Sequence, residues 1–148
     1  MANRLQKELC ELMMQPDDNI SAFPLGDNIF KWQGTINGAK KTPYENCEFK
    51  LSIDIPKEYP HHAPTIKFHP ATKCYHPNID YKTGDICLDI LKEEWSSSYT
   101  IKSILISILS LLNDPNNDSP LNEEAADLWE KDMNEFKEKI KLLNIGSK

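Results

Sequence analysis

The spacing of apolar residues changes twice along this chain, and this limits the folds that the chain can adopt. Between residues 20 and 69 apolar and polar side chains alternate, most clearly from Phe49 to Ile55. Strict alternation is typical of a strand with one side in a core and the other in solvent. Before and after this region the apolar residues recur every three or four positions, which predicts amphipathic helices. The predicted order is therefore helix, strands, helices.

Interruptions in these patterns give the element boundaries. The first helix is stopped by Pro16, and its apolar face is formed by Leu5, Leu9, Leu12 and Met13. Strands are predicted within 20–24, 28–36, 49–56 and 65–70, and later helices over 101–112, 122–131 and 134–143. Strands joined by short turns usually pair with their neighbours, which favours a four-stranded antiparallel meander. We therefore predict one α+β domain over residues 1–148, with helices packed on that sheet.

Composition and charge argue against several classes of protein. The net charge of −6 disfavours nucleic-acid binding, because a polyanion needs a basic surface. The most apolar run, residues 104–112, is about half a membrane span, and the N-terminus has no signal-peptide pattern. We therefore expect no membrane association and a cytoplasmic or nuclear location. Four cysteines without a CxxC pair are then expected to be reduced thiols.

The segment 70–99 lacks clear periodicity and contains the most distinctive chemistry. Within it, "CYHPNIDYKTGDICLDIL" places Asn78 of a His-Pro-Asn tripeptide nine positions ahead of Cys87. Long irregular segments inside compact domains are commonly functional. Cys87 could be a metal ligand, a buried side chain or a nucleophile, and the three interpretations predict different surroundings.

Zinc and simple burial are the first two interpretations. A zinc site would use His69, Cys74, His76 and Cys87, but no two of them have the tight spacing that organises ligands on one turn, so no metal is expected. Burial is common for free cysteines, and we expect it for three of them: Cys10, Cys47 and Cys74.

The third interpretation makes Cys87 a nucleophile. The neighbouring candidates for a helper are His76 and Asn78, and no hydrolase signature surrounds the cysteine. A thiol without a strong base is suited to exchanging one thioester for another, whereas peptide hydrolysis needs stronger activation.

In its wider context this segment resembles the ubiquitin-conjugating enzyme family. The motif "HPNID…GDICLDIL" is followed at the family distances by a tryptophan and by "NDPNNDSPLN". The leading "RLQKELCELM" and the strand region through "EYP" match the family in order, so the resemblance covers nearly the whole chain. Within the family, "LMMQPDDNISAFPLGDNIFKW" and "CYHPN" look most like the conjugating enzyme that serves the anaphase-promoting complex.

The resemblance implies an acyltransferase. Cys87 would accept the C-terminal glycine of ubiquitin as a thioester from the ubiquitin-activating enzyme and pass it to a lysine of a protein substrate, usually with a RING-type ubiquitin ligase. Asn78 would either stabilise the oxyanion or order the active-site loop. ATP would be consumed upstream by the activating enzyme, so no bound cofactor is expected. The alternatives are a different ubiquitin-like cargo and a catalytically silent adaptor that binds ubiquitin.

The resemblance also implies supporting residues around Cys87. His76 would brace the segment and Pro77 would set its turn, while acidic groups would help to remove the lysine proton; the acidic candidates are Asp89 and Asp118. Two features of the region around Cys87 depart from the family pattern. Ser119 stands where many members carry an aspartate, and the loop between Asn78 and Cys87 is one residue longer than usual. Partner binding is expected at the first helix, "YPHHAP" and "WSSSY", with the contact residues Arg4, Lys7, His61, Ser96 and Ser97.

Overall fold

The fold is that of a computed structural model, which describes residues 2–143 and has the predicted element order. The helix α1 is followed by four strands and then by three helices. Their bounds are α1 (Ala2–Met14), β1 (Ile20–Leu25), β2 (Asn28–Asn37), β3 (Glu48–Asp54), β4 (Thr65–Phe68), α2 (Ile101–Asn113), α3 (Glu123–Lys131) and α4 (Met133–Leu143). The predicted α+β class is confirmed. No helix in residues 2–143 is both long and apolar enough to cross a bilayer.

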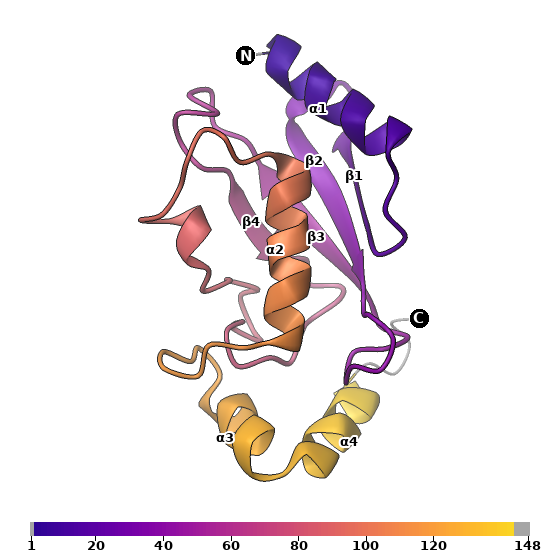
Figure 1. Cartoon of the computed structure of the whole chain (residues 1–148), viewed down its shortest axis with the longest axis vertical. Coiled ribbons are helices and arrows are strands. Elements are labelled where there is room, and N and C mark those ends of the chain that lie inside the picture. The colour runs from indigo at the N-terminus through magenta and orange to yellow at the C-terminus, as the bar shows by residue number, and fades with distance from the viewer. Residues whose placement is uncertain (1, 144–148) are drawn as a thin grey trace.

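The sheet is the predicted antiparallel meander, with the strand order β1-β2-β3-β4. The helix α2 crosses one face of it, α1 lies at one end of the molecule, and α3 and α4 lie at the opposite end (Figure 1). Gly34 of β2 lies under α2, and a Cβ there would be 3.4 Å from Cδ2 of Leu105 and 3.2 Å from Cδ1 of Ile53. A glycine at this position therefore allows close packing between the helix and the sheet.

The helix α2 is the main contributor of the helical layer to the core. Its N-terminus is closed by a capping box, in which the side chains of Thr100 and Ser103 each accept a hydrogen bond from the other residue's backbone N–H. Its apolar stripe is buried and consists of Ile101, Ile104, Leu105, Ile108, Leu111 and Leu112. The N-terminal end of α2 lies next to α1, and its C-terminal end leads into the loop before α3 (Figure 1).

Two predictions for α1 are wrong. Leu5 is fully buried, as predicted, but Cys10 is exposed and Met13 is 71% exposed. Cys10 lies roughly 140° around the helix axis from Leu5, which turns its thiol away from the core. Met13 lies in the last turn and is not covered by the body of the protein.

Candidate active site

A short turn over residues 78–87 sets Asn78 directly opposite Cys87. The backbone N–H of Cys87 donates to the carbonyl oxygen of Asn78 at 2.8 Å. The next pair inward, Ile79 and Ile86, forms an antiparallel bridge, and both side chains are buried. These contacts hold the half-buried Cys87 beside the His-Pro-Asn segment. The segment 70–99 otherwise contains only a single 3-10 turn, Asp89–Leu91.

The tip of this turn is closed by the side chain of Asp80. Oδ1 of Asp80 accepts the N–H groups of Lys82 and Thr83 at 2.9 and 3.0 Å. The hydrogen bonds from Thr83 and then Lys82 hold the pKa of Asp80 below its usual value. Gly84 has a φ of +80°, and a Cβ there would lie 2.2 Å from the carbonyl oxygen of Phe68, so a side chain would push the turn away from β4. The loop between Asn78 and Cys87, which the sequence suggests is one residue longer than usual, therefore still leaves these two residues hydrogen-bonded to each other.

His76 is fully buried and uses both ring nitrogens on backbone groups. Its Nε2 lies 2.8 Å from the carbonyl oxygen of Leu111, which can only accept, so Nε2 carries the hydrogen. Its Nδ1 accepts the N–H of Asn78 at 2.9 Å. Burial lowers the pKa of the ring from 6.5 to about 4. This neutral imidazole is therefore engaged in bracing contacts, and neither nitrogen is free to serve a thiol as a base.

The burial of His76 predicts acid-dependent stability. The unfolded chain binds a proton at this ring near pH 6.5, whereas the folded chain does so only near pH 4. The contribution of His76 to the free energy of unfolding is therefore complete above pH 6.5 and falls by about 3 kcal/mol as the pH drops to 4. Urea unfolding across this range measures the loss, and His76→Gln, which does not titrate, is the control. Equal pH slopes in both proteins would contradict the assignment.

Asn78 is 1% exposed, and its side-chain amide makes two hydrogen bonds with the backbone of one residue, Asn116. Its Nδ2 donates to the carbonyl oxygen of Asn116 at 2.6 Å, and its Oδ1 accepts the N–H of Asn116 at 2.8 Å. The carbonyl oxygen of Pro77 accepts the N–H groups of Leu121 and Asn122 at 2.8 and 3.1 Å. Two residues of the His-Pro-Asn tripeptide thus hold the loop between α2 and α3 against the Cys87 turn.

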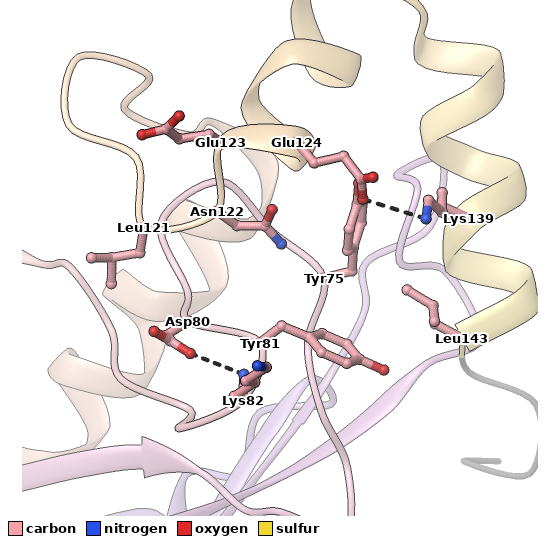
Figure 2. Close-up of a pocket in the computed structure, with 10 residues that line it drawn as sticks. All are labelled: Tyr75, Asp80, Tyr81, Lys82, Leu121, Asn122, Glu123, Glu124, Lys139 and Leu143. Carbon is pink, nitrogen blue, oxygen red and sulfur yellow. Dashed lines mark hydrogen bonds and ion pairs between the residues drawn. The ribbon is translucent and has the colours of Figure 1, made fainter.

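A second connection joins this segment to the last two helices. Tyr75 donates its hydroxyl to Oε1 of Glu124 at 2.7 Å, and Nζ of Lys139 lies 3.3 Å from the same oxygen. The hydrogen bond from Tyr75, followed by that from Lys139, lowers the pKa of Glu124. These residues line a groove of about 440 Å³ between α3, α4 and the turn, with Asp80 and Tyr81 on the opposite side (Figure 2).

The four cysteines differ in their surroundings. Cys47 and Cys74 are buried, as predicted, and burial raises the pKa of both thiols. Cys10 is exposed on α1, and Cys87 is half-buried next to the His-Pro-Asn segment. Thiolates are the reactive form of cysteine, so burial makes the first two poor nucleophiles.

The acidic candidates and Ser119 are all exposed. Asp89 begins the 3-10 turn two positions after Cys87. Asp118 and Ser119 lie in the loop that Asn78 holds, and the N–H of Asp118 donates to Oδ1 of Asn116 at 3.0 Å. This loop therefore brings Asp118 and Ser119 to the side of the site where Asn78 lies.

The four residues considered as zinc ligands, His69, Cys74, His76 and Cys87, do not form a metal-binding group in the described residues. Within residues 2–143, no three His, Cys, Asp or Glu side chains are grouped so that they could hold a metal ion. His69 is exposed and its Nδ1 accepts the N–H of Ala71 at 3.1 Å, while both ring nitrogens of His76 bind backbone.

The predicted partner surface is exposed except at Arg4. Lys7, His61, Ser96 and Ser97 lie in solvent. Nη2 of Arg4 instead donates to the carbonyl oxygens of Ser97 and Tyr99 at 3.0 and 2.8 Å, so a contact of Arg4 with a partner stays a prediction.

Sequence reasoning missed two residues, Glu8 and Asn116. Glu8 is buried on α1 three positions after Leu5, and a charged residue within the apolar face was a usable signal. Asn116 acts through its backbone, which leaves no trace in the pattern of side chains.

Comparisons with known proteins decide the family. A family model described as "Ubiquitin-conjugating enzyme" matches residues 4–144. The chain belongs to the ubiquitin-conjugating enzyme family. It is 49% identical over 138 residues to "Ubiquitin-conjugating enzyme E2-20 kDa" of Schizosaccharomyces pombe, covering 93% of this chain and 77% of that protein.

Solved structures agree with this assignment. A Toxoplasma gondii ubiquitin-conjugating enzyme domain superposes with a TM-score of 0.85 at 42% identity, covering 95% of this chain and 94% of the other. A Plasmodium yoelii protein described as a "putative ubiquitin conjugating enzyme" superposes with a TM-score of 0.87 at 42% identity, covering 95% of this chain and 90% of the other. A ubiquitin-conjugating enzyme is a thioester-forming acyltransferase that works with ubiquitin, an activating enzyme and ligases.

Proposed function

We propose that Cys87 of this ubiquitin-conjugating enzyme carries ubiquitin as a thioester and passes it to substrate lysines, usually with a RING-type ligase. The observation that carries the proposal is the position of Cys87: its half-buried thiol lies in a turn whose backbone is hydrogen-bonded to Asn78. The other three thiols lack this setting, because two are buried and Cys10 lies on α1.

The proposed reaction has two steps. In charging, the Cys87 thiolate attacks the thioester carbonyl held by the activating enzyme, forms a new C–S bond and releases the activating enzyme's thiolate. In transfer, a lysine amine attacks the Cys87 thioester, and the tetrahedral intermediate collapses to an isopeptide with release of the Cys87 thiolate and a proton. ATP is consumed by the activating enzyme, so neither step requires a cofactor on this chain.

The surrounding residues take different parts in this proposal. Asn78 holds the loop that contains Asp118, and an amide N–H near the thioester would also favour the oxyanion. Asp118 and Asp89 are proposed to receive the lysine proton through water, because both carboxylates are exposed and close in sequence to groups of the site. His76 is assigned no proton transfer, since both its ring nitrogens bind backbone.

The cargo is tested by offering the chain different activated modifiers. Ubiquitin with its activating enzyme and ATP is expected to give a reductant-labile adduct, and a second ubiquitin-like modifier with its own activating enzyme is expected to give none. A labile adduct with only the second modifier would overturn the cargo assignment. Absence of any adduct, together with ubiquitin binding, would instead identify an adaptor.

A further inference from the structure

A groove of about 250 Å³ lies where the loop between β2 and β3 meets the last two helices, at the end of the molecule opposite α1 (Figure 1). It is lined by residues 41–43 of that loop, Asn113 of α2, Trp129 of α3, and Met133 and Lys137 of α4. It shares no residue with the larger groove beside Tyr75. Four segments of the chain therefore converge on a place that the proposed reaction does not use.

The charged residues that line this groove are both positive. Lys41 and Lys137 are exposed, and no aspartate or glutamate is among the described residues that line it. Within residues 2–143, neither ammonium forms a salt bridge with a carboxylate, although four other lysines do. The groove beside Tyr75 and two others on the surface each include at least one carboxylate. In a chain with a net charge of −6, this groove is therefore suited to an anionic ligand.

Trp129 gives the same groove an apolar surface and a hydrogen-bond donor. The residue is partly buried, and its ring lies edge-on to that of Phe136, with 5.1 Å between the ring centres. The indole N–H groups of Trp32 and Trp95 donate to backbone carbonyls at 2.7 and 2.9 Å. That of Trp129 has no acceptor within residues 2–143. A carboxylate bound beside the ring would supply this acceptor.

The loop that carries Lys41 is held in place by its own hydrogen bonds. Lys41 has a φ of +67°, which is uncommon for a residue other than glycine. Its N–H donates to Oε1 of Glu45 at 3.3 Å, and the hydroxyl of Thr42 donates to the carbonyl oxygen of Ala39 at 2.7 Å. The Glu45 carboxylate is thus used on the backbone. A loop whose shape is set in advance loses less conformational entropy when a ligand binds.

Several kinds of anionic ligand fit the groove poorly. An inorganic anion would leave the apolar surface of Trp129 uncovered. A nucleic acid needs a wider basic surface, whereas Glu130 and Asp132 are exposed close to Trp129 in the sequence. A drug-sized ligand generally occupies about 300–1,000 Å³, which is more than this groove provides. Carboxylates next to an apolar side chain match both the charge and the apolar surface.

We propose that this groove docks an acidic peptide segment of a partner protein. An apolar side chain of the segment packs on Trp129, Met133 and Pro43, and flanking carboxylates pair with Lys41 and Lys137. The docking site lies at the opposite end of the molecule from α1 (Figure 1). The proposal does not depend on thioester transfer by Cys87.

The test measures binding of one synthetic probe to the full chain. The probe is a capped, fluorescently labelled peptide of glutamates and leucines, and a glutamine–leucine peptide of the same length is its neutral counterpart. Fluorescence polarisation compares the wild type with Lys41→Gln, Lys137→Gln and the double variant. The matched control is Lys141→Gln, which also removes an exposed ammonium from α4, but one that pairs with Glu138 outside the groove.

Each single variant should weaken binding of the acidic probe by about threefold, since exposed ion pairs contribute little individually. The double variant should weaken it by about tenfold if the two sites act independently. Lys141→Gln should bind like the wild type. The affinity should fall as the NaCl concentration rises, and the neutral peptide should bind far more weakly. In NMR spectra the indole N–H signal of Trp129 should move on binding, whereas that of the buried Trp32 should not.

Equal affinity of the wild type and the double variant would overturn the proposal, and so would an unmoved Trp129 signal or no binding of the acidic probe. Displacement of the probe by a single-stranded oligonucleotide at lower concentrations would reassign the groove to nucleic acid. Self-association of the wild type that the double variant loses would reassign it to a second copy of the chain. None of these outcomes involves charging of Cys87, so each leaves the proposed function standing.

Discussion

Replacing Cys87 with alanine is expected to abolish the reductant-labile ubiquitin adduct. Loss of a nucleophile typically lowers turnover by about four orders of magnitude or more. None of the other three thiols can substitute for it: Cys47 and Cys74 are buried with a raised pKa, and Cys10 is carried by α1, outside the Cys87 turn. The adduct is measured on non-reducing gels after incubation with activating enzyme, ubiquitin and ATP.

The matched control for this experiment is Cys10→Ala. Cys10 is exposed, so alanine there leaves the core unchanged and removes the most accessible alternative thiol. This variant should be charged like the wild type. An adduct that persists in Cys87→Ala and disappears in Cys10→Ala would place the thioester on α1 and contradict the assignment of the site.

Asn78→Ala is expected to slow the transfer of ubiquitin to lysine by about 100-fold or more. Alanine removes both hydrogen bonds to Asn116, so the loop that carries Asp118 is no longer held against the Cys87 turn. Charging should change much less, because exchange between two thioesters needs little help from this loop. Single-turnover discharge of the preformed thioester to free lysine measures the effect directly.

The two roles open for Asn78 predict different loop behaviour. If Asn78 acts by bracing, Asn78→Ala should also speed hydrogen exchange at the Asn116 N–H, which donates to Oδ1 of Asn78. Asn78→Asp keeps this acceptor and loses the donor, so it should protect the Asn116 N–H better than alanine does. Slow transfer with unchanged exchange would favour oxyanion stabilisation. The two-way pairing with Asn116 supports bracing.

The fold could be predicted because its core elements have strong patterns. The alternation in β3 and the apolar stripe of α2 each specify which face of the element is buried. The short turns then favour pairing between strands that are neighbours in the sequence. The predicted boundaries of the strands and later helices agree with the observed ones to within two residues. Cys87 and the His-Pro-Asn tripeptide also stood out, because they lie in a long segment without periodicity.

The hydrogen bonds of the site could not be predicted in the same way. The contacts of Asn78 with Asn116, of His76 with Leu111 and of Arg4 with Ser97 all end on backbone groups far along the chain. Backbone groups are present at every residue and carry no sequence pattern, so only the folded chain shows which of them meet. The burial of Cys10 was wrongly predicted because helical spacing alone does not say how wide the covered face of α1 is.

The most direct test of the central claim is the charging of Cys87→Ser beside the wild type. The wild type should give a band one ubiquitin heavier that disappears with reductant, because a thiol exchanges with a thioester. Cys87→Ser should give an ester at the same position that survives reductant and is cleaved by mild base. A reductant-labile band in Cys87→Ser would show that another cysteine carries ubiquitin, and would contradict the account.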